Sequence, residues 1–233
     1  MLTPAQLTGR DSSHLIDYQQ HQLQAEVAAA YARMCEAAAD QGVVIAIASA
    51  FRSFDRQLGI WNRKFNGEAP IYSDRGELLQ TEQLSTGEKI DAILTWSALP
   101  GASRHHWGTD LDLYDPRPFN TTDNKLQLTA GEYAEGGPCY DVACWLQRHA
   151  HEYGFFLPYA RYQGGVAAEP WHVSYRVIAE AARNNLSTAT LASALTDADI
   201  EGKRCILARL ADIKERYVDN ICTDNGWSDV WCG

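Results

Sequence analysis

A short apolar run at residues 43–48 limits the fold most strongly, because it stands between two segments with helical patterning. Its β-branched side chains predict a buried strand. Residues 16–39 carry apolar side chains at helical spacing, which predicts an amphipathic helix. Ser53 is suited to cap a second helix, which we expect to end near Asn66 because Gly67 follows. The chain therefore mixes helices and strands from its beginning.

The remaining sequence continues this mixture. We expect a surface excursion at 68–82, helices at 83–97 and 140–152, strands at 109–114, 153–157 and 171–176, and helical structure over 177–221. Helical crossovers of equal length are missing, which favours an α+β fold over a doubly wound sheet. We therefore predict one domain over residues 1–233, with a small antiparallel sheet flanked by helices. Its motif-bearing core covers about 43–176, between a helical N-terminal segment and a helical C-terminal tail.

The composition excludes several classes of protein. Hydrophobic residues make up 45% of the chain and charged residues 21%, which are ordinary globular values. The formal net charge of −10 argues against a nucleic-acid partner. No apolar run approaches the roughly 18 residues that a membrane span needs. The N-terminus shows no basic segment followed by an apolar one, so we expect a cytoplasmic location, with the periplasm as the alternative.

The cysteines bear on the same choice of compartment. Six are present, at positions 35, 139, 144, 205, 222 and 232, and none forms a CxxC motif. In a reducing cytosol we expect free, scattered thiols. In an oxidising compartment the alternative is a pair of local bridges, Cys139–Cys144 and Cys222–Cys232.

Two short segments carry the residue types of a catalytic centre. They are residues 103–112, SRHHWGTDLD, and residues 169–172, EPWH. Together they supply imidazoles, a carboxylate and a spare glutamate. This is the inventory of a catalytic zinc site, which has three protein ligands, an open position and a neighbouring base. Either segment alone also fits an ordinary surface turn, so the prediction depends on their combination.

The strand geometry tells which side chains of the first segment share a face. If Leu111 and Leu113 face the core, Asp110 and Asp112 point to the opposite face. His105 lies seven residues before Asp112, an odd offset that a continuous strand would send to the wrong face. A glycine at 108 can break the strand and turn His105 back toward Asp112.

A proline plays the corresponding part in the second segment. Glu169 and His172 are three residues apart and would oppose each other on a straight strand. Pro170 forces Glu169 into an extended or turn conformation just outside the strand. Both side chains can then approach one centre.

These segments resemble motifs of a known family. Residues 103–112 are similar to the SxHxxGxxxD motif, and residues 169–172 to the ExxH motif, of the zinc D-alanyl-D-alanine carboxypeptidases and dipeptidases. This is peptidase family M15, VanY/VanX-like, in the LAS group. Residues 49–57, SAFRSFDRQ, resemble its Arg-Ser motif with a downstream Gln. The chain departs from many relatives at Asp110, where they carry a small residue, and this leaves the local metal environment open.

The resemblance implies a LAS-type zinc peptidase fold and a set of site residues. It implies one zinc ion per chain, held by His105, Asp112 and His172. Glu169 would be the catalytic base, and Arg52 would bind and polarise the scissile carbonyl. The implied substrate-binding residues are Arg52, Ser103, Gln57 and Trp171. We interpret His106 as a residue that lines the pocket or supports the ligands from behind, rather than as a ligand itself.

The implied activity is hydrolysis of a peptidoglycan-derived peptide. We expect a D-alanyl-D-alanine carboxypeptidase that releases C-terminal D-Ala. One alternative is a peptidoglycan endopeptidase of the same family, and another is a metal-containing binding module that hydrolyses nothing. The presence of Glu169 and Arg52 argues against the binding module, because metal or ligand binding alone requires neither. The sequence makes no prediction of the oligomeric state.

Overall fold

The computed structural model describes residues 1–120 and 125–223. Its centre is a four-stranded sheet in the order β3-β6-β8-β7, and every neighbouring pair is antiparallel. The strands are β3 (Ala46–Ser49), β6 (Asp110–Tyr114), β8 (His172–Tyr175) and β7 (Phe155–Phe156). The predicted small antiparallel sheet is therefore confirmed, although β3 begins three residues later than expected.

The N-terminal part differs from the predicted helix over 16–39. Residues 16–23 form a hairpin of β1 (Ile16–Tyr18) and β2 (His21–Leu23), and helix α2 begins only at Ala25. Gln24, just after the hairpin, donates from its backbone N–H to the Gly108 carbonyl (3.2 Å) and from its side chain to the Trp107 carbonyl (2.7 Å). These distant contacts fix the extended conformation, and local helical spacing does not reveal them.

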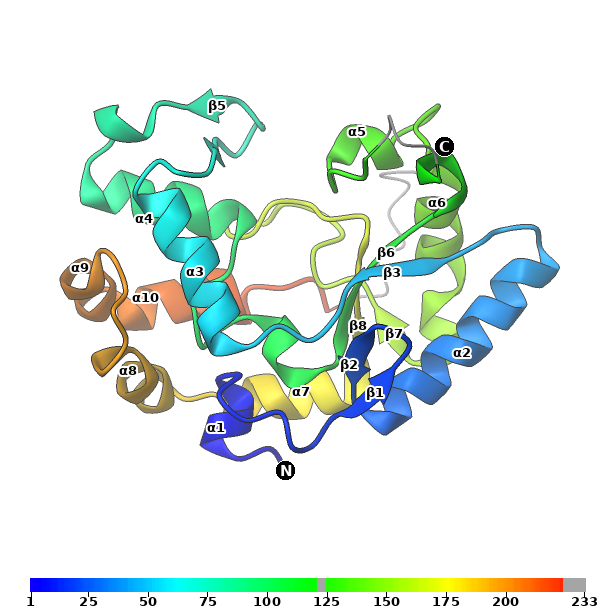
Figure 1. Ribbon diagram of the computed structural model, residues 1–233, viewed down its shortest axis with the longest axis horizontal. Coiled ribbons are helices and arrows are strands. Elements are labelled where there is room, and N and C mark those ends of the chain that lie inside the picture. The colour runs from blue at the N-terminus through cyan, green and yellow to red at the C-terminus, as the bar shows by residue number, and fades with distance from the viewer. Residues whose placement is uncertain (121–124, 224–233) are drawn as a thin grey trace.

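Two groups of helices flank the sheet, one on each side in the view of Figure 1. On one side, α2 (Ala25–Asp40) and α6 (Tyr140–His149) pack with β3 and β6 in a core that includes Val27, Met34, Leu111, Leu113 and Trp145. On the other side, helices from the middle and the end of the chain form a second core. They are α3 (Phe54–Phe65), α4 (Thr86–Trp96), α7 (Arg176–Asn185), α8 (Thr188–Thr196), α9 (Lys203–Ala208) and α10 (Leu210–Lys214). The predicted helical tail thus packs against α3 and α4.

Helix α3 begins and ends as its sequence indicates. Ser53 accepts a hydrogen bond from the backbone N–H of Arg56 (3.2 Å), as an N-cap residue does. Gly67 follows the helix with a φ of 76°, a left-handed conformation that favours glycine. The predicted helix from Ser53 to Asn66 is confirmed, and its first turn lies directly after the Arg-Ser motif.

The remaining elements are short. They are α1 (Pro4–Leu7), the hairpin β4 (Ile71–Tyr72) and β5 (Leu78–Leu79), α5 (Ala130–Tyr133), the 3₁₀ turns η1 (Thr81–Gln83), η2 (Arg104–Trp107), η3 (Arg117–Phe119) and η4 (Ala150–Tyr153), and the π-helical turn η5 (Glu215–Asp219). Within residues 1–120 and 125–223, no helix has the length and apolar character that crossing a bilayer requires.

The cysteines correct the predicted local bridges. Cys139 and Cys222 carry free thiols, as do Cys35 and Cys205, whereas Cys144 is disulfide-bonded. A Cys139–Cys144 bridge is therefore wrong. Cys139 precedes α6 and Cys144 lies five residues further along, about 140° around the helix axis, so the two side chains diverge. The alternative Cys222–Cys232 bridge is wrong as well, because the Cys222 thiol is free; Cys232 itself lies outside the described residues.

Candidate active site

The sheet brings the three predicted ligands together. Asp112 on β6 lies directly opposite His172 on β8 in the antiparallel register. His105 belongs to η2, and Gly108 follows this turn with a φ of 67°, so the chain turns back before β6 begins. One ligand atom from each residue lies within 4.8 Å of the other two, and all three side chains are buried. The turn predicted at residue 108 thus places His105 beside Asp112.

The donor atoms of this group are arranged to receive a cation. His105 donates from Nδ1 to the Ala50 carbonyl (2.8 Å), which leaves its Nε2 atom 3.4 Å from Oδ2 of Asp112. His172 donates from Nε2 to Asp110 (2.9 Å), which leaves its Nδ1 atom 3.4 Å from Oδ1 of Asp112. That Oδ1 atom is buried and has no hydrogen-bond partner in the described part of the chain. Two imidazole nitrogens and a carboxylate suit zinc, so the residues present fit this ion.

Charges within the group shift the pKa values strongly. Burial alone would raise the pKa of Asp112, but His105, His172 and Arg52 hold it below its usual range. Burial lowers the pKa of His172, yet its hydrogen bonds with Asp110 and Glu169 outweigh burial and raise the pKa to about 10. Without a metal, His172 therefore holds a proton that a bound cation would displace.

Glu169 lies beside the donor group without belonging to it. Its Oε2 atom is 3.0 Å from Nδ1 of His172, and its side chain is 12% exposed. The backbone N–H of His172 donates to the Glu169 carbonyl (3.1 Å), which closes the turn around Pro170. The proline has the effect expected from the sequence. Glu169 thus lies at the edge of the donor group, and its role as catalytic base stays a prediction.

Arg52 follows β3 and is held from two sides. Its guanidinium donates from Nη1 to Oε1 of Gln57 (3.0 Å) and from Nη2 to the Ser49 hydroxyl (3.1 Å). Gln57 is fully buried and donates in turn to the Ala98 carbonyl (2.7 Å). Both ends of the Gln57 amide are therefore occupied. Gln57 therefore holds Arg52 in place, and its contact with substrate stays a prediction.

His106 is a structural neighbour of the site. Its Nδ1–H donates to the Arg52 carbonyl (2.6 Å), and its Nε2 atom accepts from the backbone N–H of Gly101 (3.0 Å). Burial is the main cause that lowers the pKa of His106 to about 3, so the ring is neutral. A Cβ atom at Gly9 would overlap the same imidazole. His106 is absent from the His105–Asp112–His172 group, in agreement with our interpretation.

The two other predicted substrate contacts are buried. Ser103 is 1% exposed and directly precedes η2, and its hydroxyl makes no hydrogen bond within the described ranges. Trp171 is 5% exposed and packs against Tyr133, with ring centroids 5.3 Å apart. Contact of either residue with substrate stays a prediction.

The sequence also matches a protein family over most of its length. A family model described as "D-alanyl-D-alanine carboxypeptidase" (VanY) matches residues 20–178. The chain belongs to this family. The matched region contains all three motifs, at 49–57, 103–112 and 169–172. The resemblance inferred from the motifs is thus confirmed, and helices α8, α9 and α10 lie outside the matched region.

Individual proteins are also similar to this chain. An uncharacterized protein of Haemophilus influenzae is 34% identical over 126 residues, which cover 53% of this chain and 95% of the relative. The putative carboxypeptidase YodJ of Bacillus subtilis is 28% identical over 162 residues, or 67% of this chain and 47% of YodJ. Among solved structures, the LD-carboxypeptidase LdcB is similar with a TM-score of 0.51, 23% identity and 75% coverage of both chains. This last similarity shows the fold.

Two further residues lie beside the candidate site: Lys64, which was not singled out from the sequence, and Tyr159, which the sequence allowed either in an apolar groove or in the core. Lys64 donates from Nζ to the Ser97 hydroxyl (2.6 Å), and burial, with Arg52 nearby, lowers its pKa to about 8 although Glu169 opposes the shift. It lies seven residues after Gln57 on α3, a spacing that returns to the same helix face and could have indicated it. Tyr159 lies edge-on to His172, with ring centroids 5.0 Å apart.

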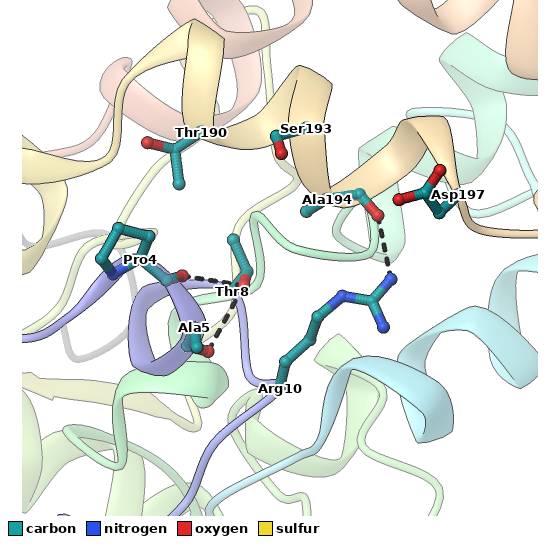
Figure 2. Close-up of a pocket in the computed structure, with 8 residues that line it drawn as sticks. All are labelled: Pro4, Ala5, Thr8, Arg10, Thr190, Ser193, Ala194 and Asp197. Carbon is teal, nitrogen blue, oxygen red and sulfur yellow. Dashed lines mark hydrogen bonds between the residues drawn. The ribbon is translucent and has the colours of Figure 1, made fainter.

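A cavity of about 430 Å³ lies elsewhere, between the first helix and α8 (Figure 2). Across it, Arg10 donates to the Ala194 carbonyl (2.9 Å). The lining residues are Pro4, Ala5, Thr8, Arg10, Thr190, Ser193, Ala194 and Asp197. None of them belongs to the three motifs, so this cavity is separate from the candidate active site.

Proposed function

We propose that the chain is a zinc-dependent peptidase that acts on peptidoglycan-type peptides and releases a C-terminal D-alanine. One observation carries the proposal: a VanY-family chain places Glu169 3.0 Å from His172 Nδ1, beside a buried group of two imidazoles and a carboxylate. A structural zinc site would require a fourth ligand, whereas a catalytic site keeps that position open. Three protein ligands with an adjacent base support hydrolysis.

Each neighbouring residue has a defined task in this reaction. A zinc ion held by the group would polarise the scissile carbonyl and make a water molecule acidic enough to lose its proton near neutral pH. Glu169 accepts that proton and then delivers it to the departing amine. The short distance to His172 keeps its carboxylate at the reacting centre.

Arg52 stabilises the negative charge that develops on the carbonyl oxygen. A guanidinium has five N–H donors, and within the described part of the chain the hydrogen bonds to Gln57 and Ser49 use two of them. The other donors remain for a substrate oxygen. Because both anchors are in place before substrate arrives, the donor is preorganised, which contributes on the order of 3 kcal/mol to transition-state stabilisation.

Positive charge beside the centre supports cleavage next to a free carboxylate. Arg52 and Lys64 interact with each other and with Glu169. The two cations form a region suited to an anionic chain end, and the Ser103 hydroxyl adds a hydrogen-bonding group. These features favour a carboxypeptidase, which binds the free C-terminus, over an endopeptidase.

The decisive experiment compares two peptides. The purified protein, with its zinc content measured, is incubated with a stem peptide ending in D-Ala–D-Ala and with the same peptide amidated at its C-terminus. Mass spectrometry should show release of one D-Ala from the free acid and little cleavage of the amide, because unpaired polar groups in the site would reject it.

Other outcomes identify the alternatives. Equal cleavage of both peptides, or cleavage inside the stem, would favour the endopeptidase. Stoichiometric zinc without any cleavage would favour the binding module. Glu169→Ala is the matched control, because it should keep zinc and release no D-Ala.

A further inference from the structure

Asp110 lies next to His172 because of the register of β6 and β8. Asp112 is paired with His172, and Asp110 is paired with Ser174, two residues further along β8. Asp110 and His172 are therefore diagonal neighbours on one face of the sheet, a separation that long side chains can bridge. Nε2 of His172 donates to Oδ1 of Asp110 over 2.9 Å, and Asp110 is fully buried.

Two further groups hold the Asp110 carboxylate in place. Arg104 donates from Nε to Oδ1 (2.7 Å), and the Thr109 hydroxyl donates to Oδ2 (2.6 Å). Arg104 also donates from Nη2 to Ser174 (2.6 Å), and its guanidinium lies near the rings of Trp107 and Phe156. Both charged side chains are almost completely inaccessible to water.

An ion pair this deeply buried contributes little net stability to a fold, because its desolvation penalty is large. The penalty for removing each ion from water is several kcal/mol, and apolar residues of similar size often stabilise a protein equally well. The position of this pair suggests a different role. Its carboxylate contacts the imidazole of a candidate metal ligand.

The contact determines which nitrogen of His172 is available. A carboxylate accepts a hydrogen bond, so the hydrogen of a neutral imidazole stays on Nε2 and Nδ1 presents its lone pair. Nδ1 is the atom that lies 3.4 Å from Asp112 and 3.0 Å from Glu169. His105 is fixed in the opposite sense, since its Nδ1 donates to the Ala50 carbonyl and its Nε2 faces the group.

We propose that Asp110, anchored by Arg104, is a positioning residue that orients His172 so that Nδ1 binds the metal, and that it strengthens this nitrogen as a ligand. The inference rests on the proposed function only in taking zinc as the ion. Carboxylates that hydrogen-bond to metal-binding histidines commonly change metal affinity by 10- to 100-fold when they are removed.

The test measures zinc affinity by competition with a chromogenic chelator. Asp110→Ala should weaken binding by about 10- to 100-fold. Asp110→Asn keeps the shape of the side chain and an accepting oxygen but loses the charge, so we expect a smaller loss of about 3- to 10-fold. The asparagine variant preserves the test if the alanine variant fails to fold.

Asp115→Asn provides the matched control. Asp115 is also a buried carboxylate paired with an arginine, Arg117, and it directly follows β6 without contacting a candidate ligand. Its variant should bind zinc within twofold of the wild type. A change confined to the Asp110 variants would then separate metal positioning from a general loss of stability.

Cobalt substitution gives a second readout. The visible absorption of bound Co²⁺ depends on ligand geometry, so its bands should shift in the Asp110 variants and remain unchanged in Asp115→Asn. A purely structural role would lower the melting temperature while leaving zinc affinity and the cobalt bands of the folded protein unchanged, and that result would overturn the inference.

The outcomes also separate this inference from the proposed function. If the wild type binds zinc but cleaves no peptide, the proposed activity fails and the role of Asp110 stands. If peptides are cleaved while the Asp110 variants bind zinc as tightly as the wild type, the role of Asp110 fails. A wild type without zinc affinity would overturn both.

Discussion

The backbone N–H of Arg52 donates to the carbonyl of His105 over 3.2 Å. This hydrogen bond joins the end of β3 to η2, so the residue expected to bind substrate is tied to a candidate metal ligand. The side chain of His106, the residue after His105, donates from Nδ1 to the Arg52 carbonyl. Arg52 and the candidate metal-binding group are therefore held together by hydrogen bonds on both sides.

The hydrogen bond between Gln57 and Arg52 predicts a kinetic effect. Gln57→Leu removes the acceptor that holds Nη1 of Arg52, and the freed guanidinium becomes less well aligned with the transition state. We expect kcat/KM for a D-Ala–D-Ala peptide to fall about 10-fold, and Arg52→Ala to cost about 100-fold or more. Steady-state kinetics measures both, and zinc content should stay constant. Unchanged kinetics in Gln57→Leu would show that this anchor has no effect.

Substitutions of Glu169 and of His172 should have different effects on the bound zinc. Glu169→Ala keeps the three candidate ligands but loses the base, so zinc should remain near one ion per chain while kcat falls by at least about 100-fold. His172→Ala removes a ligand and should lose most of the zinc as well. Metal analysis alongside kinetics distinguishes the two variants. A Glu169→Ala protein that retains full turnover would show that Glu169 is not the base.

Lys64 predicts a pH dependence on the alkaline side. Its pKa is lowered to about 8, chiefly by burial, so its charge is present below pH 8 and is lost as the pH rises through that value. If the ammonium attracts the substrate carboxylate, KM should increase above pH 8 while kcat changes less. In Lys64→Met this alkaline rise in KM should disappear, and KM at pH 7 should already be higher. A pH profile of the variant that matches the wild type would exclude Lys64 from substrate binding.

The lowered pKa of Lys64 also determines how the free energy of unfolding changes with pH. Between pH 8 and the ordinary lysine pKa of 10.5, the unfolded chain binds more protons at Lys64 than the folded chain does. The contribution of Lys64 to the free energy of unfolding therefore increases with pH over this interval. Denaturant unfolding of wild type and Lys64→Met at pH 8 and pH 10 would isolate this contribution.

Gly9 and Gly42 form a matched pair for testing the packing over His106. Both glycines have positive φ, 74° and 80°, so alanine is strained at either position. At Gly42 a Cβ atom would meet nothing within 4 Å, whereas at Gly9 it would overlap the His106 imidazole. We expect Gly42→Ala to cost about 1 kcal/mol and Gly9→Ala clearly more, together with a fall in kcat. Equal losses in denaturant unfolding would show that the imidazole moves at no cost.

The sequence predicted the parts of this site that depend on local rules. Gly108 was expected to turn His105 toward Asp112, and Pro170 to bring Glu169 beside His172, because each effect follows from the conformational limits of one residue. The Ser53 cap of α3 is local in the same sense. These predictions required no knowledge of distant contacts.

The parts that were missed depend on contacts between distant segments. The hairpin at 16–23 is fixed at its end by hydrogen bonds from Gln24 to residues 107 and 108. The role of Asp110 depends on the register between β6 and β8, which a single sequence does not reveal. Trp171 could equally line a groove or fill a core, and only packing shows that its ring contacts Tyr133.

The tail helices are tied to the catalytic machinery through α3, although they bear none of its groups. Trp61 of α3 donates from its indole nitrogen to the Glu201 carbonyl (3.1 Å) and shares a buried core with Leu191, Ile206 and Ile213. Gln57, one turn earlier on the same helix, holds Arg52. The boundary recognised by homology, at residue 178, is thus not the boundary of the folding unit. A truncation at residue 178 would remove the helices that pack against α3. Because Gln57 of α3 holds Arg52, we expect the Arg52 guanidinium to lose its fixed orientation as well.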